Sequence, residues 1–197
     1  MEYNYITLGY DCSTAATLKN LSLRSHSLPF DWVVSNIDDI IRCISEDFIN
    51  FHKDLYLNSG KTRLIDHYGF EYPHDYPNSD VVEIDNVGNG VFGETTINDN
   101  WRDFIDINLE KYNRRSKRFL DILKSDTDLI VLYRGPISNI IKFKNFMKYR
   151  FNKDNIKYVV ATTENCNEPD IISCNPEING EWNDHNIWGE AIKKAKD

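Results

Sequence analysis

The sequence predicts a single α/β domain, in which helices cover both faces of a mainly parallel sheet. Strand-like and helix-like segments alternate in the last third of the chain, which is typical of such a sheet. Residues 129–133 form a nearly continuous apolar run, as expected for a strand covered on both faces. The length of 197 residues fits one domain.

The N-terminal part of the chain predicts one strand and two helices. The strand covers 5–8 and is closed by Gly9, and the first helix covers 13–21, with Asp11 or Cys12 at its cap position. The second helix covers 36–48, where isoleucines recur at helical spacing.

The middle of the chain, from about residue 51 to residue 93, predicts an irregular region of short strands and loops within the same domain. Its strand-like runs are 63–65, 81–84 and 90–92. The segment 95–124 then predicts one long amphipathic helix or a bent pair of helices.

The last third predicts a regular alternation of elements. After the strand at 129–133 we expect a helix at 138–151 and a strand at 157–161. A short strand at 171–174 and a helix at 186–196 complete the chain.

The charge of the chain argues against two classes of partner. Its formal net charge is −8, which gives no attraction to nucleic acids or to anionic membranes. No apolar run approaches the ~20 residues of a spanning helix, and the N-terminus lacks the features of a signal peptide. We therefore expect a cytoplasmic protein. Abundant Asn, Ile and Lys suggest a low-GC bacterium or a large DNA virus, in which case the compartment is the host cytoplasm.

Cysteine usage and motif content predict neither a disulfide scaffold nor a cofactor. Four cysteines are too few for such a scaffold in a chain of this length, and no CxxC pair is present. No phosphate-binding loop, dinucleotide fingerprint or HExxH motif occurs. We expect no metal and no cofactor.

Cys12 is the first candidate for catalysis. It follows the first strand and begins the first helix, at the carboxyl edge of the predicted sheet, where active groups gather. The partial positive charge of a helix N-terminus favours a thiolate, so we expect a lowered pKa. The alternative is an inert small residue of the core. Cys43 and Cys174 fit packing positions, and Cys166 lies in a polar loop.

His74 and Asp75 are the second candidate, because a nucleophilic cysteine needs a base and the base needs an orienting acceptor. Prolines on both sides stiffen their loop. The alternative is a surface turn, and His26, His52 and His67 are competitors for the role of base.

The carboxyl edge of the sheet offers two further candidates. Arg134 ends the buried strand and would enter the same crevice as Cys12, either to bind an anionic group or as a paired structural arginine. Asp184 and His185 precede the last helix and resemble the acid–base block of SGNH hydrolases, with residues 9–13 in the place of their nucleophile motif. A helix cap at Asp184 is the other interpretation.

Several segments, taken in order, resemble a family of domains of unknown function described as putative papain-like cysteine peptidases, found in bacteria and large DNA viruses. The opening signature is Leu8-Gly9-Tyr10-Asp11-Cys12, followed by Ser27-Leu28-Pro29-Phe30-Asp31-Trp32. Weaker matches follow: His74-Asp75, Tyr112 with Arg115, Arg118 and Phe119, then Arg134, and finally Trp182 with Trp188.

The resemblance implies that Cys12 is the nucleophile and His74 the base, with Asp75 as orienter and Asp31 and Trp32 shaping the pocket. Backbone N–H groups near Ser13 would then stabilise an oxyanion. Two other functions stay open. One is a glycan-modifying enzyme, a glycosyltransferase or SGNH-like esterase, in which Asp31, Arg134 and His185 line the pocket. The other is a non-catalytic binding module. The substrate would be a peptide, an amide or a glycan.

Overall fold

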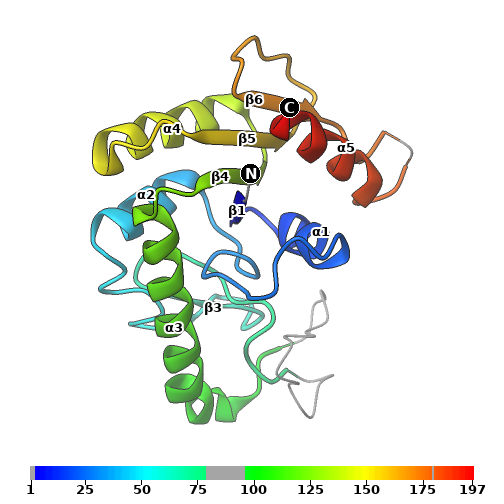
Figure 1. Cartoon of the computed structure of the whole chain (residues 1–197). Helices are drawn as coiled ribbons and strands as arrows, with labels where there is room; N and C mark the ends of the chain where they lie inside the picture. The colour runs from blue at the N-terminus through cyan, green and yellow to red at the C-terminus, as the bar shows by residue number, and fades with distance from the viewer. Residues whose placement is uncertain (1–2, 79–95, 179) are drawn as a thin grey trace.

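Four parallel strands form the central sheet of the computed structural model, which describes residues 3–78, 96–178 and 180–197 (Figure 1). The strand order is β1-β4-β5-β6, and Tyr3 of β1 lies opposite Asp128 of β4. Because all four strands run the same way, their carboxyl ends meet at one edge, where ligands bind in open α/β sheets. The strands are β1 (Tyr3–Leu8), β4 (Asp128–Arg134), β5 (Ile156–Ala161) and β6 (Ile171–Cys174).

Helices cover both faces of this sheet, as the sequence predicts (Figure 1). Successive side chains of a strand point to opposite faces. Accordingly, Ile130 and Leu132 of β4 pack with Leu18 and Trp188, whereas Val131 joins the other apolar cluster. One face carries α1 (Ser13–Asn20) and α5 (His185–Lys196), and the other carries α2 (Ile37–Ser45) and α4 (Ile137–Phe151).

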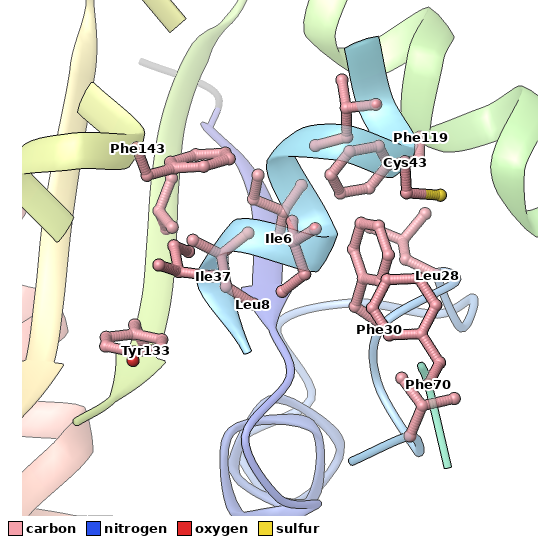
Figure 2. Packing of buried hydrophobic residues seen from close by; sticks show 14 of the residues in the cluster. Ile6, Leu8, Leu28, Phe30, Ile37, Cys43, Phe70, Phe119, Tyr133 and Phe143 are labelled. Carbon is pink, nitrogen blue, oxygen red and sulfur yellow. The ribbon is translucent and has the colours of Figure 1, made fainter. Parts of the chain in front are cut away.

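The larger core lies on the α2 and α4 side and continues away from the sheet to α3 (Ile105–Lys124) (Figure 2). Phe30 is fully buried at its centre, with ring centroids 5.2 Å from Phe119 and 5.5 Å from Phe70. Cys43 is packed in the same cluster, in agreement with its expected role. This core fixes α3 and the loops around it.

The described part of the irregular middle region holds one small antiparallel pair, β2 (Tyr56–Leu57) and β3 (Leu64–Ile65). β3 corresponds to the strand-like run at 63–65. The runs at 81–84 and 90–92 lie outside the described residues.

The segment 95–124 does not form one continuous helix. A 3-10 helix, η1 (Asp99–Phe104), precedes α3, and the Trp101 amide donates to the Asn98 carbonyl at 3.1 Å, a bond three residues back. Residue 95 lies outside the described residues. The predicted helix at 36–48 ends early, because Asp47 and Phe48 adopt positive φ angles of 49° and 62°.

The state of the cysteines and the character of the helices bear on two expectations from the sequence, concerning disulfides and membrane-spanning segments. All four cysteines are free thiols. Within the described ranges, no helix has both the length and the apolar character needed to cross a membrane.

Candidate active site

Cys12 lies at the carboxyl edge of the sheet, between the end of β1 and the start of α1. It is the N-cap residue of α1, and its carbonyl accepts from the Ala16 amide at 2.9 Å. The capping side chain is that of Asp11, which accepts from the Ser13 amide at 2.8 Å and also from the Ser13 hydroxyl. The Cys12 side chain itself makes no capping bond, and the residue is partly exposed.

The pKa of the Cys12 thiol is raised, which is the opposite of the expected shift. Burial is the largest cause, and the neighbouring Asp11 carboxylate adds to it. Arg134 acts in the other direction but does not compensate. The lowered pKa expected from the helix N-terminus is therefore wrong, because burial of the thiol, reinforced by the Asp11 carboxylate, outweighs the effects that lower the pKa. In the free protein Cys12 is a neutral thiol at pH 7.

The turn before Cys12 is fixed by a close backbone approach at Gly9. A Cβ atom on Gly9 would lie 2.7 Å from the Phe30 carbonyl oxygen and 2.8 Å from the Ser35 hydroxyl. The Ser35 hydroxyl also donates to the Gly9 carbonyl at 2.6 Å. Only glycine fits here without a shift of backbone atoms, so the path from β1 into α1 is tightly constrained.

Arg134 lies at the same edge as Cys12, because β4 is the neighbour of β1. Its Nε donates to the Ser13 hydroxyl at 2.9 Å and lies 3.6 Å from an Asp11 carboxylate oxygen. Its other nitrogens bind the Glu177 carboxylate and the Asn183 side-chain oxygen. Protein groups thus already occupy this guanidinium, as they would for a structural arginine.

Asn183 joins the C-terminal segment to α1. The side-chain nitrogen Nδ2 donates to the Ser13 carbonyl at 3.0 Å and to the Thr17 hydroxyl at 3.2 Å. The side-chain oxygen Oδ1 accepts from the Trp188 indole at 2.8 Å. His185 lies beside it, with Nδ1 3.0 Å from the Thr17 hydroxyl. Asn183 is buried, and the sequence offers no signal that separates it from other asparagines.

Asp184 is the N-cap residue of α5, and its side chain accepts from the Asn186 amide at 2.9 Å. Asp184 therefore caps α5, which agrees with the helix-cap interpretation of this residue. His185 faces Thr17 of α1, and no acid–base role follows from these contacts.

His74 is buried and lies edge-on against Trp32, with a ring-centroid distance of 6.1 Å. Trp32 is partly exposed and lines a surface pocket together with Ala15, which is three residues after Cys12 on α1. Trp32 thus connects the surroundings of the predicted base to the helix that begins at the predicted nucleophile.

Asp75 is buried, and both of its carboxylate oxygens are engaged by α3. One binds the Lys111 ammonium, and the other accepts from the Tyr112 hydroxyl at 2.8 Å. Burial alone would raise the pKa of Asp75, but Lys111 and the bonds from Lys111 and Tyr112 outweigh it and hold the pKa below its usual range. The Asn108 amide also donates to the Asp75 carbonyl at 2.8 Å. Asp75 therefore anchors the His74 loop to α3.

Asp31 is fully buried and has three protein donors. They are the Thr7 hydroxyl at 2.6 Å, the Leu28 amide at 2.7 Å and the Arg24 guanidinium. These bonds tie β1 to the loop at 24–31. The carboxylate shapes the pocket next to Trp32 by holding this loop in place.

The competing histidines have other surroundings. His52 is buried with its Nε2 2.7 Å from the Tyr76 hydroxyl, and burial lowers its pKa to about 4. His67 lies 3.2 Å from Asp54 near the surface, and His26 is exposed. Among the other cysteines, burial raises the pKa of Cys174 to about 12.

The described residues define a three-layer α/β protein with a cysteine at the carboxyl edge of a parallel sheet. Residues 3–140 match the sequence profile of the family described as putative papain-like cysteine peptidase, and the chain belongs to that family. The matched range contains Cys12, His74 and Arg134 but ends before Trp182 and Trp188. No curated protein and no solved structure matches the chain.

Proposed function

We propose that the protein is a cysteine hydrolase that cleaves a peptide or amide bond, with Cys12 as nucleophile and His74 as base. The observation that carries the proposal is the position of Cys12. It is partly exposed, it starts the first turn of α1, and it lies at the carboxyl edge of the sheet. Membership of the family described as putative papain-like cysteine peptidase supports the same assignment.

The surroundings of Trp32 support His74 as the base. The indole contacts the His74 ring and shares a pocket with Ala15 of α1. Asp75 holds the backbone of this segment against α3, so the imidazole is carried on an anchored loop. A base on an anchored loop is held in position, which general-base catalysis requires.

The raised pKa of Cys12 determines how the thiol would react. The Cys12 proton passes to the His74 imidazole while the sulfur forms a bond to the substrate carbonyl carbon. The resulting imidazolium then protonates the leaving amine as the C–N bond breaks, which leaves a thioester on Cys12. Water attacks the thioester carbonyl carbon while the imidazole takes one of its protons. The C–S bond then breaks, the imidazolium returns a proton to the sulfur, and the acid product leaves Cys12 as a thiol.

The Ser13 amide is not assigned to the oxyanion site in this proposal, because it already donates to the Asp11 carboxylate. The glycan-modifying alternative has no specific observation in its favour. Asp31, Arg134 and His185, which would line its pocket, are each hydrogen-bonded to protein groups.

Hydrolysis of p-nitrophenyl acetate tests the proposal without knowledge of the natural substrate. We expect the wild-type protein to release p-nitrophenolate above the uncatalysed rate, and Cys12→Ala to fall to that rate. Cys166→Ala is the matched control, because Cys166 is also a partly exposed free thiol, and it should retain activity. Activity that survives in Cys12→Ala and falls in Cys166→Ala would contradict the proposal.

A further inference from the structure

A pocket of about 220 Å³ lies between α1 and the loop that follows it, with one wall formed by α3. Lys19 of α1, Arg24 of the loop and Arg115 of α3 line it, together with Asp31 and Trp32. Neither Cys12 nor His74 is among its lining residues. The volume is below the roughly 300–1,000 Å³ of sites for drug-sized ligands, so it suits a small group.

Positive charge is concentrated in this pocket, although the chain as a whole carries a net charge of −8. Among the described lining residues, Lys19, Arg24 and Arg115 are cations and Asp31 is the acid. The Arg24 guanidinium already binds Asp31 and the Tyr5 carbonyl. Among the described lining residues no further acid balances Lys19 and Arg115, while Asp75, outside the lining, acts on Arg115 through its charge.

Two buried guanidinium nitrogens at this wall have no hydrogen-bond acceptor within the described part of the chain. They are Nη1 of Arg115 and Nε of Arg118. Arg118 uses Nη2 to donate to the carbonyl of Ser27, a lining residue, at 2.8 Å, and Arg115 lies over the Tyr112 ring at 5.3 Å. Leaving charged donors buried without an acceptor is costly, so these nitrogens need an acceptor that the described residues do not supply.

The arginines also act on one another. The pKa of Arg118 is lowered, first by burial and then by Arg115, Arg114 and Arg24. Like charges held this close repel, and a bound anion would relieve that repulsion.

We propose that this pocket binds the phosphate group of a small phosphate monoester. Guanidinium groups donate parallel N–H bonds that match phosphate oxygens, and Lys19 adds a mobile ammonium at the rim. A phosphate monoester carries close to two negative charges at pH 7, which matches the two cations left over better than a single carboxylate does. Trp32 gives the group attached to the phosphate an apolar wall.

This site goes beyond the proposed hydrolase function and does not depend on it, because its residues are not those of the proposed nucleophile and base. Trp32 lines this pocket and also contacts His74, so it borders both sites. Phosphate binding therefore stands or falls separately from the reactivity of Cys12.

Isothermal titration calorimetry at a fixed ionic strength of about 0.15 M tests the proposal. The probes are inorganic phosphate and ribose 5-phosphate, with ribose and succinate as the uncharged and the carboxylate controls. We expect both phosphates to bind with one site per chain, ribose 5-phosphate more tightly, and ribose not at all. Absence of phosphate binding, or succinate binding as tight as that of ribose 5-phosphate, would overturn the proposal.

Variants locate the site. Arg115→Gln should weaken ribose 5-phosphate binding by about tenfold or more, because it removes a charge-assisted donor. Lys19→Gln, at an exposed helix position, should weaken binding in the same direction and covers the case in which Arg115→Gln does not fold. Arg114→Gln is the matched control, since Arg114 is exposed and pairs with Glu110. Equal losses in Arg114→Gln and Arg115→Gln, or a loss in Cys12→Ala, would place the site elsewhere.

Discussion

The surroundings of its sulfur distinguish Cys12 from the other cysteines. Cys43 is packed in the core and Cys174 belongs to a strand, and burial is the largest cause of the raised pKa of each thiol. Cys12 is partly exposed at the start of a helix, and the acid that raises its pKa is the residue before it. The position of Cys12 could be predicted from the strand–glycine–helix pattern. The sign of its pKa shift could not, because it depends first on how far the folded chain buries the sulfur and then on the nearby Asp11 carboxylate.

His52 is a buried histidine with a structural role. Its ring packs against Tyr72 and Tyr112, and its Nε2 contacts the Tyr76 hydroxyl. The ring is neutral at pH 7 because burial lowers its pKa to about 4. No local pattern in the sequence separates this histidine from His74, since the difference arises from long-range packing.

We expect His52 to make the protein less stable in mild acid. The folded-state pKa of about 4 lies below the unfolded value of about 6.5. The unfolded chain therefore binds more protons between these pH values, and stability falls as the pH drops through that window, by about 3 kcal/mol for this group. Urea unfolding from pH 7 to pH 4 should show a flatter profile in His52→Asn than in the wild type. His26→Asn, at an exposed position, should follow the wild-type profile. A His52→Asn profile parallel to that of the wild type would refute the assignment of this pH dependence to His52.

At the scale of elements, α3 holds the loop that carries His74. Lys111, Tyr112 and Asn108 all bind Asp75, because Asn108 lies three residues before Lys111 and four residues before Tyr112, spacings that place side chains close together on a helix surface. The apolar side of α3 was predictable from its periodicity. Its polar contacts with Asp75 were not, because the partners are more than 30 residues apart in sequence.

Removal of Lys111 should leave Asp75 as an uncompensated buried charge. Lys111→Met should lower the free energy of unfolding at pH 7 by about 2–3 kcal/mol, below the full cost for a buried pair because Lys111 is one-quarter exposed. The wild-type pKa of Asp75 is lowered, so its stabilisation is present above about pH 4 and lost as the pH falls through the folded-state value. The difference in the free energy of unfolding between the wild type and Lys111→Met should therefore shrink below pH 4.

Denaturant unfolding at pH 7 and pH 3 measures both effects. Lys117→Met on the exposed side of the same helix is the matched control and should cost little at either pH. A loss for Lys111→Met that is no larger than for Lys117→Met would show that the Asp75 anchor contributes nothing.

At the scale of the whole molecule, the parallel sheet with helices on both faces could be predicted because both ends of the chain alternate between strand and helix. β4 is apolar and buried from Leu129 to Tyr133 and lies between β1 and β5, as its sequence indicates. The connection from α1 to β4 could not be predicted in the same way. It contains the aromatic core around Phe30, to which α3 contributes Phe119 from its periodic apolar side, whereas Phe30 and Phe70 lie in loops without a periodic pattern.

The segment between α1 and β4 also separates Cys12 from Arg134 in the sequence. Cys12 and Arg134 meet at the sheet edge because parallel neighbouring strands end there, and this follows from topology. The basic pocket is assembled from α1, the following loop and α3, and only the folded chain brings Lys19 and Arg115 together.

Trapping of an acyl group on Cys12 tests the central claim most directly. The protein is mixed with p-nitrophenyl acetate at pH 8, quenched in acid, and its acetylated cysteines are identified by peptide mass spectrometry. The claim predicts a thioester on Cys12 in preference to Cys166, reduced by roughly a hundredfold in His74→Asn but not in His26→Asn. Acetylation of Cys166 instead, or of Cys12 at the same rate in His74→Asn, would contradict it.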